Sequence, residues 1–172
     1  MRRKIPLLLA VILVVALAGS AGAATKGSNR PMKASTSGTS TSDATGAPIV
    51  VSASSGTGQA SHLGSSAYQL NTTQDWSGYD LNTNPCGVIQ PGSTMSFTAA
   101  NGDTVTGSVS GTVCEQFPPS MTSYVSTLTV TIMGGTGRFT GATGTLLGSG
   151  VSTATGPGTF ADTGSFEGAI TY

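Results

Sequence analysis

The sequence predicts an all-β protein, an antiparallel barrel of seven or eight strands. Two observations lead to this fold class. Apolar and hydroxyl side chains alternate with a period of two in several segments between residues 48 and 172, which is typical of strands with one buried face. No segment after residue 23 carries the apolar stripe of a helix, and the 25 glycines of the chain favour turns and strongly curved strands.

Residues 1–23 have the pattern of a signal peptide for export. Basic residues at positions 2–4 precede an apolar run over residues 5–18, and small residues at positions 21–23 supply a cleavage site. The apolar run is shorter than the about 20 residues that a membrane span needs. We therefore expect a secreted, cell-surface or periplasmic protein with no stable membrane insertion after cleavage. An uncleaved N-terminal anchor is the alternative.

The part of the chain that remains after cleavage is acidic. It has four basic and seven acidic side chains, a net charge of about −3. From Pro48 onward, Arg138 is the only basic residue beside six acidic ones. Nucleic-acid binding depends on Lys and Arg contacts to phosphates, so we expect no nucleic-acid partner.

Residues 24–47 are rich in Ser, Thr, Gly, Ala and Lys and contain almost no large apolar side chain. Such a segment buries too little apolar surface to offset the entropy lost when it becomes ordered. We expect a disordered linker over residues 24–47 and a single barrel domain over residues 48–172.

The clearest strand of this domain covers residues 104–113. Its valines and glycines fall on one face, and its threonines and serines fall on the other. Residues 94–99 alternate in the same way, and Asn101-Gly102 between the two segments is a strong signal for a two-residue hairpin. Further strands are predicted at residues 127–132 and 166–172, and a β-branched run begins at residues 49–51.

Cys86 and Cys114 are the only two cysteines. An even number of cysteines in an exported chain indicates a disulfide bond. The bond joins the segment before the strand at residues 94–99 to the end of the strand at residues 104–113. Closing this loop of 29 residues stabilises the fold by about 3.5 kcal/mol in the chain-entropy description.

The segment at residues 134–144, GGTGRFTGATG, resembles a signature of allene oxide cyclases and of plant dirigent proteins, which are eight-stranded antiparallel barrels. Small exported bacterial proteins of this barrel type, most without assigned function, are more similar still. They add a His-Leu-Gly near the start, an Ala-Asn-Gly-Asp hairpin and a final aromatic-Gly-x-Ile-x-Tyr strand. This chain has the three features at residues 62–64, 100–103 and 166–172.

The resemblance implies the barrel fold, and no catalytic residue carries over from it to this chain. We expect no cofactor and no metal, since a zinc site needs three or four His, Cys or carboxylate ligands and the two cysteines are expected to be paired. Dirigent proteins carry arginines after the phenylalanine of this segment, where the chain has Thr140 and Thr143. The catalytic Glu, Asn and Pro of allene oxide cyclases match no residue here. His62 is the only histidine, and we expect it to be a hydrogen-bonded strand residue.

Three residues are candidates for ligand binding. Trp76 and Tyr79 lie in the segment Asp-Trp-Ser-Gly-Tyr-Asp, where aromatic rings beside carboxylates suit a sugar or an apolar ligand at a barrel mouth. Alternatively, Trp76 fills the core from a loop. Arg138 is the third candidate, as an anchor for a carboxylate ligand. Its alternative role is a structural ion pair with Asp103 or Glu167.

Three classes of function are consistent with the sequence. The absence of a G-x-S-x-G nucleophile elbow and of metal-ligand clusters favours a non-enzymatic exported barrel that binds a small apolar or amphipathic ligand. The second class is an isomerase or cyclase of the allene oxide cyclase type, and the third is a cell-surface or matrix protein with no small ligand. An open interior with polar groups would favour the first two classes, and a filled interior the third.

Overall fold

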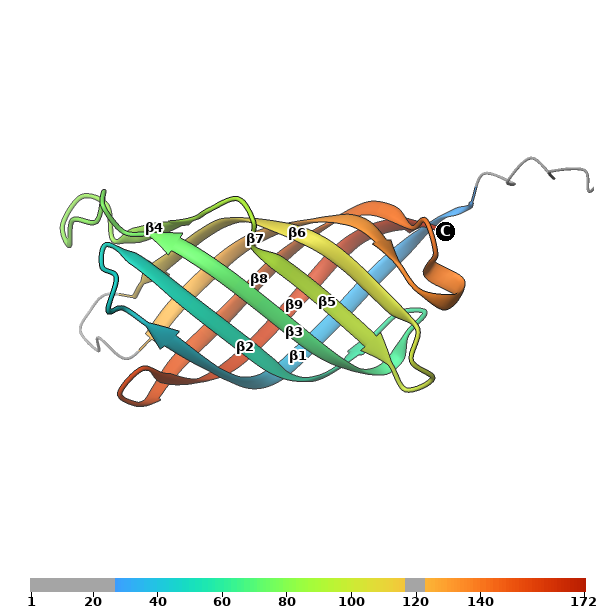
Figure 1. Ribbon diagram of the computed structural model, residues 1–172, viewed down its shortest axis with the longest axis horizontal. Helices are drawn as coiled ribbons and strands as arrows, with labels where there is room; N and C mark the ends of the chain where they lie inside the picture. The colour runs from blue at the N-terminus through green and yellow to red at the C-terminus, as the bar shows by residue number, and fades with distance from the viewer. Residues whose placement is uncertain (1–26, 117–122) are drawn as a thin grey trace, which may run out of the picture.

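The structure, a computed structural model, describes residues 27–116 and 123–172. The predicted signal peptide lies outside the described residues. Nine antiparallel strands and one short 3₁₀ helix make up the described chain (Figure 1). The elements are β1 (Asn29–Asp43), β2 (Ile49–Ala60), β3 (Gly64–Asp75), β4 (Cys86–Ile89), β5 (Thr94–Ala99), β6 (Thr104–Glu115), β7 (Ser123–Gly135), η1 (Gly137–Phe139), β8 (Thr143–Gly156) and β9 (Thr159–Thr171).

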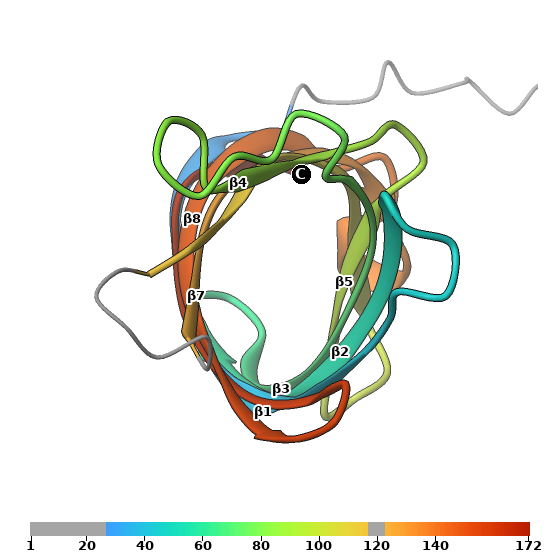
Figure 2. The same ribbon diagram turned by 90° about the vertical axis from the view of Figure 1, so that its left-hand side faces the viewer.

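The sheet closes into a ring, because β1 pairs with β2 on one side and with β9 on the other. The short strands β4 and β5 share one position between β3 and β6, so nine strands give an eight-membered ring. Every pairing is antiparallel. The predicted antiparallel barrel is confirmed, and Figure 2 shows the ring from one end.

The predicted disordered linker is wrong over most of its length. Residues 29–43 form β1, which makes ten register pairs with β2 and thirteen with β9. Met32 and Ala34 of β1 are buried in the core, and pairing on both sides satisfies the backbone groups of the strand. The barrel therefore begins at Asn29 and not at Pro48.

The two ends of the barrel differ. The closed end carries the β2–β3 turn, the β5–β6 hairpin and η1, and the mouth end carries the β1–β2 turn, the β3–β4 loop and the β8–β9 turn (Figure 1). Large side chains fill the closed end. The most deeply buried of them are Met32, Phe97, Val105, Val130, Phe139, Leu146 and Ile170.

The glycine-rich segment closes this end. η1 places Phe139 in the core with no exposed surface. Gly137 begins η1 with φ of +58°, and a Cβ atom there would overlap the carboxylate of Asp103. Only glycine meets both conditions, so the segment serves strand and turn geometry.

Two local predictions from the sequence are confirmed. Cys86 and Cys114 lie opposite each other on β4 and β6 and form a disulfide bond. Asn101-Gly102 lies in the predicted hairpin between β5 and β6, with φ of +87° at Gly102. The turn is longer than the two residues that the sequence predicts, because the last register pair before it joins Thr98 to Thr104.

The expectation for His62 is only half correct. His62 is hydrogen-bonded, because its Nε2 lies 2.9 Å from the carbonyl oxygen of Pro31. It lies in the β2–β3 turn and not in a strand, with φ of +69°.

Within residues 27–116 and 123–172, no helix is long and apolar enough to cross a membrane.

Candidate functional site

The barrel interior is open in its mouth half. A cavity of about 570 Å³ lies there, walled by strands from the whole ring and by residues of the β1–β2 turn and the β3–β4 loop. Its inner limit is apolar and includes Leu70, Met95 and Leu128. Cavities of this volume hold small organic ligands in other proteins.

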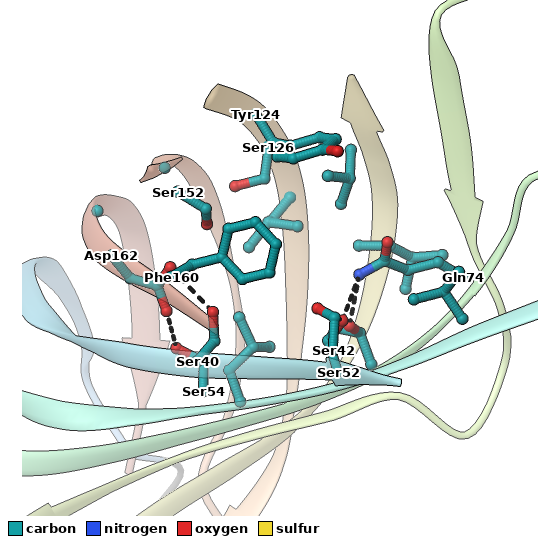
Figure 3. A pocket seen from close by; sticks show the side chains of 18 of the residues that line it. Ser40, Ser42, Ser52, Ser54, Gln74, Tyr124, Ser126, Ser152, Phe160 and Asp162 are labelled. Atoms are coloured by element: carbon teal, nitrogen blue, oxygen red, sulfur yellow. Dashed lines mark hydrogen bonds between the residues drawn. The ribbon is translucent and has the colours of Figure 1, made fainter. Parts of the chain in front are cut away.

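Serines make one wall of the cavity. On the inward face of β1, Met32 is buried in the closed end, whereas Ser40 and Ser42 line the cavity. On β2, Ser52 and Ser54 line it in the same way (Figure 3). The inward face of β1 thus changes from apolar to polar toward the mouth, and the inward serines of β2 lie beside those of β1. Small side chains at these positions leave the interior open.

Asp162 of β9 is held by two of these serines. Ser40 Oγ donates to Asp162 Oδ1 at 3.1 Å, and Ser54 Oγ donates to Asp162 Oδ2 at 2.6 Å (Figure 3). Because Ser54 has a single proton, its contact of 3.1 Å with Tyr68 must use the Tyr68 hydroxyl as donor. Burial raises the pKa of Tyr68, the charge of Asp162 adds to this, and the phenol stays protonated at neutral pH.

Gln74 of β3 organises the part of the wall next to the serines of β2. Its Nε2 donates to Ser52 Oγ at 3.3 Å and to Thr72 Oγ1 at 3.0 Å. Its Oε1 accepts a hydrogen bond of 3.1 Å from the indole nitrogen of Trp76. Gln74 therefore links the polar wall to Trp76 and orients the indole ring.

Four aromatic rings in series surround the mouth. The ring centroids are 5.6 Å apart for Tyr79 and Trp76, 6.2 Å for Trp76 and Tyr124, and 5.7 Å for Tyr124 and Phe160. We call these four residues, all of which line the cavity, the aromatic mouth. Gly87 of β4 makes room for it, because a Cβ atom there would overlap the indole of Trp76.

Glu115, at the end of β6, also lines the cavity. Its Oε2 accepts a hydrogen bond of 2.5 Å from the hydroxyl of Tyr79. This bond to a carboxylate favours the neutral phenol and raises the pKa of Tyr79 to about 12. Burial, and to a lesser degree the charge of Glu115, also raises the pKa of Tyr124.

The structure brings together two of the three residues that the sequence nominated. Trp76 and Tyr79 both line the cavity. Arg138 lies at the closed end and is not part of the lining. Its Nε is 3.2 Å from Asp103 Oδ2, and its guanidinium lies 5.1 Å from the centre of the Phe139 ring. The predicted ion pair with Asp103 is confirmed.

Sequence reasoning missed the rest of the lining. A signal was present in the serines two residues apart on either side of residues 44–48, since that spacing puts side chains on one face of a strand. Without the ring closure, nothing in the sequence connects these serines with a carboxylate more than 100 residues away. The missed residues that make the polar contacts and the aromatic mouth are Ser40, Ser42, Ser52, Ser54, Tyr68, Gln74, Glu115, Tyr124, Phe160 and Asp162.

Comparison with protein-family models, curated proteins and solved structures finds no match for this chain. The resemblance of residues 134–144 to allene oxide cyclases and dirigent proteins therefore stays a prediction.

Proposed function

We propose that the protein is an exported, non-enzymatic barrel that binds a small amphipathic ligand in its mouth cavity. The observation that carries this proposal is the division of the interior into a packed half and an open half of about 570 Å³. An apolar inner limit, a hydroxyl-lined wall and an aromatic mouth suit a ligand with one apolar and one polar end.

The small inward residues argue against a purely structural barrel. Burial of one Leu or Ile side chain stabilises a fold by about 2 kcal/mol. Ser40, Ser42 and Ser54 occupy inward positions where such side chains would fill the barrel. The barrel is therefore less stable than one whose interior is filled by larger side chains, as is common for proteins with a ligand site. This favours ligand binding over a surface or matrix role without a ligand.

The lining chemistry favours binding over catalysis. Among the described residues that line the cavity, none is His, Lys or Cys. The serines of the cavity therefore lack the imidazole or amine base that activates a serine nucleophile. The carboxylates of Asp162 and Glu115 accept hydrogen bonds from neighbouring hydroxyl groups.

Export is part of the proposal. The signal-peptide pattern at residues 1–23 and the disulfide between Cys86 and Cys114 both support an oxidising compartment outside the cytoplasm. N-terminal sequencing of the secreted protein should find a start near Ala24 or Thr25. Recovery of intact Met1 in the membrane fraction would contradict cleavage.

Trp76 offers a direct test of ligand binding, because it is the only tryptophan and lines the cavity. The mature chain is titrated with octyl glucoside below its micelle concentration while Trp76 emission is recorded. We expect a saturable change with one ligand per chain. A linear, non-saturating response would contradict the proposal.

A matched pair of variants locates the binding. Ser126 points into the cavity from β7, and its neighbour Thr127 is exposed on the outer face. Ser126→Phe should fill the cavity and weaken binding at least about tenfold, since it removes the space for the ligand tail. Thr127→Phe adds the same ring outside and should leave the affinity unchanged. Equal affinities in the two variants would place binding elsewhere.

A further inference from the structure

Acidic side chains collect at the mouth end. Asp43 and Asp75 stand at the mouth ends of β1 and β3, Asp80 lies in the β3–β4 loop, and Glu115 and Asp162 line the cavity. Backbone N–H groups bonded to Asp43, Asp75 and Asp80 lower the pKa of each carboxyl. These groups are therefore ionised at neutral pH.

Basic side chains collect at the opposite end. Within residues 27–116 and 123–172 they are three: Lys33 and Arg138, and Arg30 near the start of β1. Lys33 Nζ lies 2.9 Å from Glu167 Oε1, and Arg138 pairs with Asp103. Arg30 lies over the ring of Tyr172, 4.9 Å from its centre. Among the described residues, the cations thus lie at the closed end, and the negative charge of the mouth has no basic side chain beside it.

The interior repeats this asymmetry. The described lining residues include two carboxylates and no Lys, Arg or His. Ser40 and Ser54 direct their protons at Asp162, so they have only lone pairs left to offer a ligand. Each oxygen of Asp162 also keeps acceptor capacity. This part of the wall is built to receive a donor or a positive charge.

The aromatic mouth fits the same chemistry. The face of an aromatic ring attracts a cation within about 6 Å of its centre, and Trp gives the strongest attraction. Trp76, Tyr79, Tyr124 and Phe160 follow one another at 5.6–6.2 Å between ring centroids, with Glu115 bonded to Tyr79. Clusters of aromatic rings recognise quaternary ammonium groups in other proteins, and a carboxylate beside them adds an attraction between opposite charges.

We propose that the ligand of this cavity is an organic cation with an apolar tail, an alkylamine or a quaternary ammonium amphiphile. The inference rests on the proposed binding function and adds the ligand's charge. The negative mouth attracts the cation, the aromatic mouth and the two carboxylates hold its head group, and the apolar inner limit takes the tail.

The test compares three probes that share one octyl tail: octyltrimethylammonium, octyl glucoside and octyl sulfonate. Affinities are measured by calorimetry at low ionic strength and below the micelle concentration of each probe. We expect the cation to bind at least about tenfold more tightly than the sulfonate, because both attraction to the carboxylates and cation–π contacts favour it. The glucoside should lie between them.

Two variants, one double and one single, identify the charges responsible. Asp162→Asn combined with Glu115→Gln keeps the size of both side chains and should reduce the preference for the cation to less than about threefold. Glu167→Gln removes one charge from the outer surface, where Glu167 is 70% exposed, and should leave the preference unchanged. Retained affinity for the glucoside shows that the double variant is folded.

The outcomes of this experiment distinguish the charge of the ligand from the proposed ligand binding itself. Equal binding of the three probes, or tighter binding of the sulfonate, would overturn the cation inference while leaving the ligand-binding barrel in place. A full preference that persists in the double variant would overturn the assignment to Asp162 and Glu115. Failure of all three probes to bind would overturn both proposals.

Discussion

At the residue scale, two polar contacts at opposite ends of the barrel have different roles. Arg138 and Asp103 join η1 to the β5–β6 hairpin beside the packed core. Tyr79 and Glu115 join the β3–β4 loop to β6 at the cavity. The first contact stabilises the closed end, and the second fixes a ring and a carboxylate that line the cavity. Each contact leads to a separate prediction.

Arg138→Ala should lower the free energy of unfolding by about 1 kcal/mol, because a half-exposed ion pair and one cation–π contact are both weak. Urea denaturation of the wild type and the variant measures the change, and Arg138→Lys, which keeps the charge, should lose less. Probe binding should be unaffected in both variants. Loss of binding at unchanged stability would instead make Arg138 a ligand anchor.

Tyr79 should titrate at about pH 12 in the folded protein, against an ordinary pKa of 10.0. Since the fold binds this proton more tightly, the stabilising contribution is fully present below pH 10 and is lost as pH rises from 10 to 12. Absorbance at about 295 nm, where tyrosinate absorbs, follows the titration. Glu115→Gln should move one of the four tyrosines back toward pH 10. An unchanged titration curve would show that Glu115 does not control Tyr79.

At the element scale, the sequence predicts strands where the two faces differ in polarity. The β5–β6 hairpin was predictable because its inward residues are apolar and Asn101-Gly102 occupies its turn. β1 was not, because hydroxyl side chains and glycine occupy both faces over residues 35–42. The cavity is the cause, since inward residues of β1 line an open space and not a core. The small polar residues that obscure β1 in the sequence are therefore the residues that line the cavity.

The contribution of β1 is tested by two shortened chains. A chain that begins at Gly27 keeps β1 and should melt as the mature protein does. A chain that begins at Pro48 leaves β2 and β9 as unpaired edges, which promotes aggregation, and it should lose its cooperative thermal transition by circular dichroism. The same transition in both chains would mean that β1 is dispensable for the barrel.

At the scale of the whole molecule, the barrel is asymmetric in packing and in charge. Its closed end holds the core and every described basic side chain, and its mouth end holds the cavity and most of the acidic ones. The sequence shows an acidic chain with one tryptophan, and Trp76 and Tyr79 were found from their local segment. The separation of charge required the fold, because strands far apart in sequence bring these groups to each end.

We propose the open half of the barrel as the ligand site. ¹H–¹⁵N correlation NMR of the mature protein, titrated with octyl glucoside below its micelle concentration, tests it most directly. We expect chemical-shift changes at the Trp76 indole and at the backbone amides that line the cavity, those of Phe160, Asp162 and Ser126. The amides of Phe139 and Ala142, at the closed end, should be unchanged. Shifts confined to the outer face or the closed end, or no shifts, would contradict this proposal.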